Sequence, residues 1–155
     1  MIKKLFFLKS VAIIFLVTGC GFKVVNQSEI IDFNINNIST SGDRRISYII
    51  KNNLLPYSKS DGKKLLNIEI DINKNKSIKE RNIKNEITKF QISITAFVQY
   101  RSEKNGKFQI SKRGNFNVSN QYSQTLNNEK KLIEMLSESI AESIIEELIS
   151  RVNDS

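Results

Sequence analysis

The chain has 155 residues, enough for one compact domain and too few for two comfortable ones. Its single cysteine excludes an intramolecular disulfide, and its lack of histidine excludes Ser-His, Cys-His and histidine-ligated zinc chemistry. The formal charge of +8 is compatible with nucleic acid, an acidic membrane surface or another anionic ligand as partner.

The first predicted element is an export signal. Lysines at positions 3, 4 and 9 precede an uncharged apolar stretch, Val11 to Val17, which is typical of a signal peptide. A membrane-spanning helix needs about 20 apolar residues, and polar residues follow soon after this stretch. We therefore expect residues 1–19 to be a lipoprotein signal peptide and residues 20–155 to form a single domain.

Cys20 directly follows two small residues, Thr18 and Gly19. This arrangement resembles the lipobox of bacterial lipoproteins, in which the cysteine sulfur receives a diacylglycerol and the new amino terminus is acylated after cleavage. The alternatives are an ordinary signal peptide with a chance cysteine nearby and a buried free thiol. Several acyl chains anchor a protein stably, whereas one binds only marginally. The sequence thus predicts a covalent diacylglycerol and N-acyl anchor on Cys20.

Two further features bear on the compartment. Gly21, and not an aspartate, follows the cysteine, and in many lipoproteins of double-membraned bacteria this pattern goes with sorting to the outer membrane. Removing residues 1–19 removes three lysines and lowers the formal charge from +8 to +5. We expect a protein that is lipid-anchored on the periplasmic side of the outer membrane, and export argues against nucleic acid as its partner.

The mature domain begins with a predicted strand in residues 29–38. Ile31, Phe33 and Ile35 alternate there with polar residues, which is the pattern of a half-buried strand. A strand at this position would place these three side chains in the core.

A helix is predicted next, over about residues 42–54. Thr40 and Asp43 have the spacing of a capping box at its start, and Pro56 disfavours helical geometry at the residue before it. The apolar side chains recur at the spacing of one helix face; they are Ile46, Ile49, Ile50 and Leu54.

Three more strands are predicted, in residues 65–73, 86–101 and 108–122, because apolar and polar side chains alternate there. We expect a polar, basic link to join the first two. Asn105-Gly106 is a strong hairpin signal between the last two, and Gly114 is a candidate for a bulge.

The carboxyl-terminal segment, residues 127–152, predicts the longest helix. An apolar residue occupies every fourth position of one face; these are Leu132, Leu136, Ile140, Ile144, Leu148 and Val152. The element order is then β-α-β-β-β-α. We expect an α+β fold in which two helices pack on one face of a four-stranded, mostly antiparallel (mixed) sheet, with the first crossover joining parallel strands.

Five basic residues gather around the link between the second and third strands, with only Glu80 among them; they are Lys74, Lys76, Lys79, Arg81 and Lys84. Lysine supplies a point charge and arginine a bidentate fork, so both suit the phosphates of a lipid. The alternative is solubility together with protection of strand edges against pairing.

Several stretches resemble the LPS-assembly lipoprotein family LptE. Cys20 to Phe22 ("CGF") is close to the cysteine-glycine-aromatic start of that family, and Asp43 to Leu54 ("DRRISYIIKNNL") is similar to its first helix. Glu80 to Lys84 ("ERNIK") is similar to its basic stretch before the third strand. The order of elements extends the likeness over nearly the whole chain, although residues 120–128 lack the basic residue that family members can place there.

The resemblance implies a function in lipopolysaccharide (LPS) assembly. The domain would be the plug and partner of an outer-membrane β-barrel (LptD-like) and would bind LPS through basic residues at one end of the sheet, with Arg81 and Lys84 foremost. It implies no metal and no cofactor besides the covalent lipid.

Two other classes of function remain. A lipoprotein that is an accessory or tethering module of another envelope transport complex would share the anchor and the fold. An enzyme would have to use carboxylates such as Glu69 and Asp71, which the alternation places on an outward strand face where solvation explains them. We therefore expect no catalytic residue.

Overall fold

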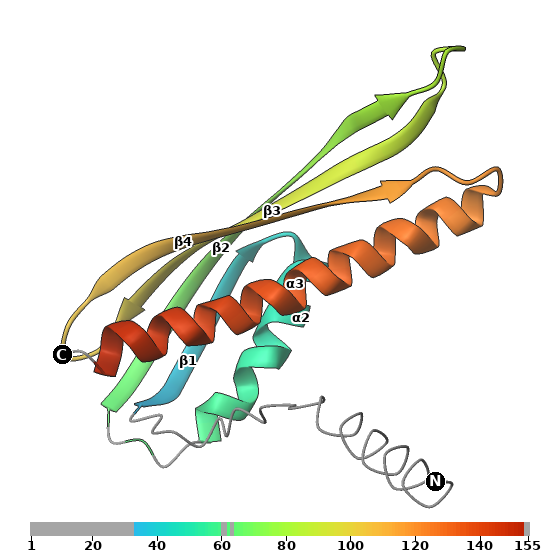
Figure 1. The fold of residues 1–155 in the computed structure, drawn as a ribbon. Coiled ribbons are helices and arrows are strands. Elements are labelled where there is room, and N and C mark those ends of the chain that lie inside the picture. Colours follow the sequence, from blue (N-terminus) through green and yellow to red (C-terminus); the bar gives the residue numbers. More distant parts are fainter. Residues whose placement is uncertain (1–32, 60–61, 63, 154–155) are drawn as a thin grey trace, which may run out of the picture. The chain divides into compact units, whose positions relative to one another are not determined.

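A computed structural model describes residues 33–59, 62 and 64–153 of the chain. The predicted signal peptide, Cys20 and the start of the first predicted strand lie outside these residues. The elements occur in the predicted order β-α-β-β-β-α (Figure 1), as β1 (Phe33–Gly42), α2 (Arg44–Leu54), the 3-10 helix η1 (Leu55–Lys59), β2 (Lys64–Arg81), β3 (Ile87–Arg101), β4 (Gly106–Asn117) and α3 (Tyr122–Asn153).

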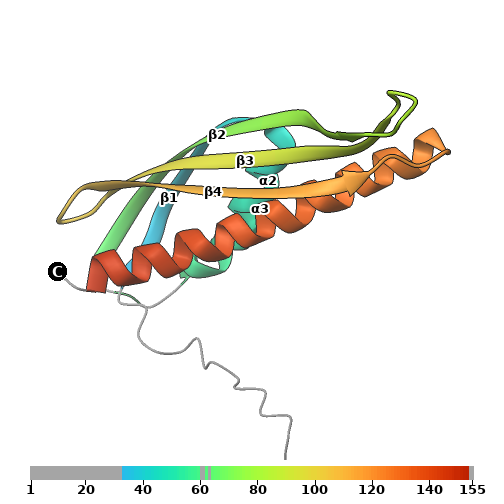
Figure 2. The ribbon, with the colours of Figure 1, turned by 45° about the horizontal axis from the view of Figure 1, so that its top comes forward.

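The four strands form one mixed sheet in the order β1-β2-β3-β4. β1 and β2 are parallel and are joined through α2, whereas β2 with β3 and β3 with β4 are antiparallel. Figure 2 shows α2 and α3 on the same side of the sheet. The predicted α+β architecture is confirmed.

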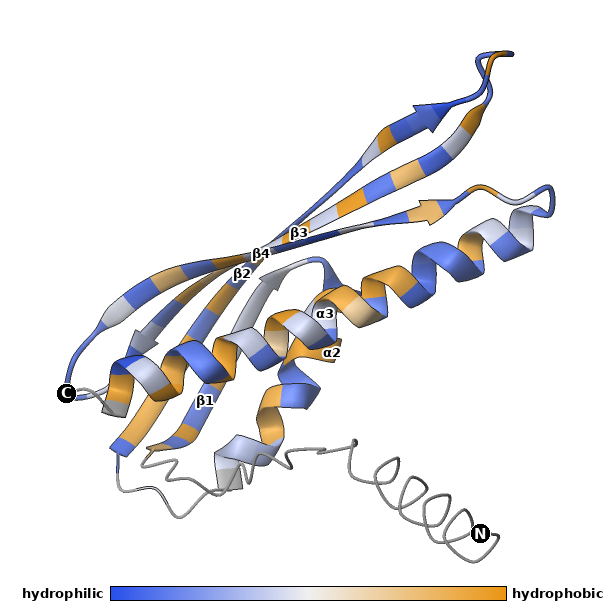
Figure 3. Ribbon diagram, in the orientation of Figure 1, coloured by the Kyte–Doolittle hydropathy of each residue, from blue (hydrophilic) through white to orange (hydrophobic). Residues whose placement is uncertain are grey.

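The core lies between the sheet and the two helices. The even-numbered apolar residues of β2, from Leu66 to Ile72, are buried, and the residues between them are exposed. All six apolar residues predicted on one face of α3 are also buried. The same alternation of hydrophobic and hydrophilic residues can be followed along the strands in Figure 3. Because burying each such side chain contributes about 1.5–3 kcal/mol, the alternation determines which face of the sheet is covered.

β1 contains a bulge that the alternation of apolar and polar residues in the sequence does not predict. The pairing with β2 shifts between Ile35 and Asn37, so Asn36 is an extra residue. Ile35 and Ile38 are therefore both buried although they are three positions apart, and the strand continues to Gly42.

The start of α2 differs from the predicted capping box. Thr40 lies in β1, and Asp43 is itself the N-cap: its carboxylate oxygen Oδ1 accepts the backbone N–H groups of Arg45 (3.1 Å) and Ile46 (3.2 Å). Gly42 precedes it with φ 95°, in the left-handed region, and its backbone lies against the carbonyl of Ile72. Only glycine has no Cβ to clash there.

Two other predictions are wrong. The basic link is mostly strand, because β2 continues to Arg81 and the turn occupies only residues 82–86. Gly114 marks no bulge, because the register of β3 with β4 is unbroken on both sides of the pair Ile92 and Gly114. Instead, a Cβ at Gly114 would lie 2.6 Å from Cδ1 of Leu132, so the glycine leaves room for α3 to pack closely on β4.

Candidate functional site

The turn between β2 and β3 is held by its own hydrogen bonds. The side-chain oxygen of Asn82 accepts the backbone N–H groups of Lys84 (3.0 Å) and Glu86 (2.9 Å), and its amide nitrogen donates to the Glu86 carboxylate (2.7 Å). Asn85 has φ 63°, a left-handed conformation that asparagine tolerates. The turn is thus a defined structure that presents particular side chains.

The side chain that this turn exposes most is apolar. Ile83 is fully exposed, at 103% of its reference area, and is the only apolar residue between Lys79 and Glu86. Burying an isoleucine side chain contributes about 1.5–3 kcal/mol of favourable free energy. Contact with Ile83 would therefore stabilise a complex with an apolar partner. Sequence reasoning missed Ile83, although a single apolar residue in a polar turn was the available signal.

Three of the five predicted basic residues surround this apex. Arg81 donates from Nη1 to the carbonyl oxygen of Asn85 (2.7 Å), which holds its guanidinium at the turn. Lys84 follows Ile83, and Lys79 is exposed just before the turn. We call the residues Lys79, Arg81, Ile83 and Lys84 the tip.

The carboxylate nearest to the tip in sequence is already paired. Glu80 lies 2.7 Å from Nζ of Lys89, and the hydrogen bond from this lysine, together with its charge, lowers the pKa of Glu80 below its usual value. Glu80 is therefore ionised at neutral pH and is compensated by Lys89. Glu86 is the other carboxylate of the turn, so the three cations of the tip leave a net charge of +2 there.

The other two predicted residues, Lys74 and Lys76, lie away from the tip. Lys74 pairs with Asp43 (2.5 Å), and Lys76 pairs with Glu129 of α3 (2.6 Å). The ammonium of Lys76 also lies over aromatic rings, 4.5 Å from the centroid of Phe90 and 5.2 Å from that of Phe116. The structure therefore divides the predicted cluster into a tip and two lysines that join the sheet to the helices.

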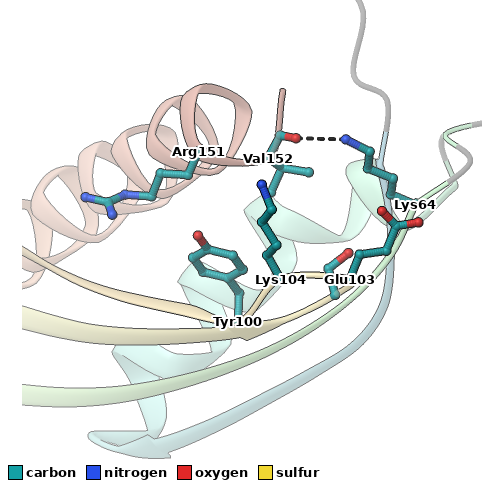
Figure 4. Close-up of a pocket in the computed structure, with 7 residues that line it drawn as sticks. Lys64, Tyr100, Glu103, Lys104, Arg151 and Val152 are labelled. Atoms are coloured by element: carbon teal, nitrogen blue, oxygen red, sulfur yellow. Dashed lines mark hydrogen bonds between the residues drawn. The ribbon is translucent and has the colours of Figure 1, made fainter. Parts of the chain in front are cut away.

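The opposite end of the sheet carries a pocket of about 200 Å³ (Figure 4). Lys64 donates to the carbonyl oxygen of Val152 at the end of α3 (2.9 Å). Arg151 pairs with Glu147 (2.6 Å) and lies over the ring of Phe108. Lys64 and Arg151 therefore have partners within the fold and stabilise the end of α3. For this reason the pocket is a weaker candidate for the functional site than the tip.

The carboxylates considered for catalysis lie on the uncovered face of the sheet, as predicted. Glu69 lies 3.4 Å from Nη2 of Arg101, and the hydroxyl of Ser41 donates to Asp71 (2.7 Å). Both carboxylates are exposed and have ordinary polar partners.

The described part of the chain has neither a cluster of metal ligands nor a membrane-spanning helix. It contains no group of three or more histidine, cysteine, aspartate or glutamate residues placed to hold a metal ion. None of its helices is long and apolar enough to cross a membrane.

The fold is that of several bacterial lipoproteins of known structure. The rare lipoprotein B of Shewanella oneidensis superposes with a TM-score of 0.60 at 9% identity, over 77% of this chain and 98% of that one. The minor lipoprotein of Acinetobacter baumannii gives 0.58 at 9% identity, over 79% and 93%, and an uncharacterized lipoprotein B of Nitrosomonas europaea gives 0.56 at 11%, over 81% and 88%. No protein-family model and no curated protein matches the sequence.

Proposed function

We propose that this protein is an outer-membrane lipoprotein of the LptE type, anchored through acylated Cys20 on the periplasmic side and assisting the assembly of LPS at the cell surface. The shared fold with bacterial lipoproteins and the lipobox-like sequence support the anchor. The resemblance of "CGF" and of the first helix to the LptE family supports the proposed role in LPS assembly.

The single observation that carries the proposal is the composition of the tip. It combines three cations with a fully exposed isoleucine on a turn held by hydrogen bonds. LPS is an anionic amphiphile, whose phosphates suit lysine and arginine and whose acyl chains suit an exposed apolar side chain. The tip therefore offers complementary chemistry to both parts of the molecule.

The proposed partner is an LptD-like β-barrel, with this domain lodged in its lumen as a plug. Such a role requires binding and positioning but no covalent chemistry. We accordingly propose no catalytic residue, no metal and no cofactor besides the lipid on Cys20.

The test reverses two charges at the tip. In the full-length protein, Arg81→Glu combined with Lys84→Glu should weaken LPS binding by at least about tenfold, because two attractive phosphate contacts become repulsive. Ile83→Ser should weaken binding to LPS but not to its deacylated form. Binding is measured with purified protein in detergent by titration calorimetry.

The matched control is Lys104→Glu combined with Lys107→Glu, which makes the same change of charge in the β3–β4 hairpin at the other end of the sheet. Both lysines are exposed, so the control should keep its binding. Equal losses in the two double variants would mean that bulk charge, and not the tip, attracts LPS.

A second candidate is an accessory or tethering module of a different envelope transport complex, which the same fold and anchor would serve. Purification from native membranes in mild detergent separates the two. An LPS-exporting barrel in the complex supports the first function, whereas a different transporter in its place supports the second.

A further inference from the structure

Among the residues that the structure describes, the hairpin of β2 and β3 leaves one strand edge uncovered. β1 pairs with β2 only as far as Gly42, which lies opposite Ile72. Beyond that point β2 continues to Arg81, and no described strand pairs with this side of residues 73–81. Figure 1 shows this end of β2 extending past the end of β1.

The backbone groups at this edge belong to the even-numbered residues. The carbonyl oxygen of Ile72 faces Gly42, and the hydroxyl of Ser39 reaches the carbonyl oxygen of Ile68, both on the β1 side. Because successive residues of a strand direct their N–H and C=O groups to opposite sides, those of Lys74, Lys76 and Ile78 face the same way as those of Ile72. A strand lying beside residues 73–78 would find donors and acceptors in the correct alternation.

Lysines at a strand edge commonly repel an approaching strand and so prevent pairing. At this edge, Lys74 and Lys76 instead form ion pairs. Lys74 is held by Asp43 (2.5 Å) and Lys76 by Glu129 (2.6 Å), on the side of the sheet that carries the helices. The residues that alternate with these lysines on the uncovered face are uncharged, namely Asn73, Asn75 and Ser77. The edge is consequently close to electrically neutral until Lys79.

We propose that this edge binds an extended segment of a partner protein as an additional strand. The segment lies antiparallel to β2, which is the more stable pairing, and its backbone supplies the hydrogen bonds. Lys79 and Arg81 lie at the far end of the edge, so the segment carries carboxylates in its amino-terminal part. This interaction uses the side of β2; it shares Lys79 and Arg81 with the tip but needs neither Ile83 nor Lys84.

The test uses a defined nine-residue peptide with three glutamates in its amino-terminal third followed by alternating threonine and valine. On addition to the full-length protein, the amide protons of Lys76 and Ile78 should exchange at least about tenfold more slowly, because a new strand protects them. A peptide of the same sequence with N-methyl groups on its edge-facing amides cannot form the ladder and should give no protection.

The matched variants are Ile78→Pro and Ile78→Ala. Proline removes the N–H group that faces the open edge but leaves the pairing with β3 intact, so the dissociation constant of the peptide should rise by about tenfold or more. Alanine shortens the side chain and keeps the N–H group, so binding should change by less than about threefold. Unchanged resonances from β3 and β4 show that both variants fold.

Three outcomes would overturn the proposal. They are an absence of protection with millimolar peptide, equal binding of the N-methylated peptide, and an unchanged dissociation constant for Ile78→Pro. Protection that grows with protein concentration in the absence of peptide would assign the edge to a second copy of this chain and would also exclude the proposed partner.

Discussion

At the scale of single residues, Asp43 has two functions in the fold. It caps α2 through two backbone N–H groups, and it pairs with Lys74 of β2. Partial burial alone would raise the pKa of Asp43, but the hydrogen bond from Lys74 and the capping N–H groups outweigh it and lower the pKa below its usual value of 3.8. The carboxylate therefore stabilises the fold while it is ionised.

The corresponding prediction concerns acid stability. Because the folded state has the lower pKa, the contribution of Asp43 is complete above the unfolded pKa and is lost as pH falls through the folded pKa. Asp43→Asn keeps a capping side chain but loses the charge, so it should lower the free energy of unfolding by up to about 1 kcal/mol at pH 7 and by almost nothing near pH 2. Urea unfolding of the wild type and of Asp43→Asn at pH 7 and near pH 2 measures this difference in the free energy of unfolding.

The comparison variant Asp43→Ala loses the cap as well, which should cost about 1 kcal/mol more at neutral pH. If the effect of Asp43→Asn were the same at pH 7 and pH 2, the pair with Lys74 would not contribute to stability.

At the scale of elements, the two longest described elements are α3 and β2. α3 spans 32 residues and buries an apolar face from Leu132 to Val152, whereas β2 spans 18 residues and buries side chains only in its first half. The second half of β2 has no β1 beside it, and apart from Ile78 its residues are polar or charged. The same absence of apolar alternation led to the wrong prediction of a link.

The packing of α3 gives the second prediction. Ile140 is fully buried at the middle of this helix, and Ile140→Ala should lower the free energy of unfolding by about 2–5 kcal/mol, because it removes apolar contacts and leaves a cavity. Met135 lies on the same helix and is 62% exposed, so Met135→Ala should change the free energy of unfolding by less than about 0.5 kcal/mol. Urea titrations followed by circular dichroism compare the two, and equal losses would show that α3 does not pack as described.

At the scale of the whole molecule, the tip and the start of β1 mark opposite ends of β2. Phe33 pairs with Lys64 at one end, and Arg81 lies at the other, about 56 Å away at the usual rise per residue.

The proposed lipid anchor gives the third prediction. Cys20→Ser removes the only thiol of the chain, so the variant should take up no fatty acid and should leave the membrane fraction, because acyl chains supply the stable attachment. Metabolic labelling with a fatty acid and fractionation of cells measure both effects. The purified variant should keep the unfolding transition of the wild-type domain, and persistent fatty-acid labelling would refute the assignment of Cys20.

The sequence by itself determined the element order and the faces that are buried, because apolar periodicity reports directly which side chains leave water. It also predicted that basic residues gather near the turn between β2 and β3. Only the tertiary structure decided that Lys74 and Lys76 pair with Asp43 and Glu129, since ion pairs between distant segments have no periodic signature. The bulge at Asn36, the close packing at Gly114 and the open edge of β2 likewise depend on which segment lies beside which.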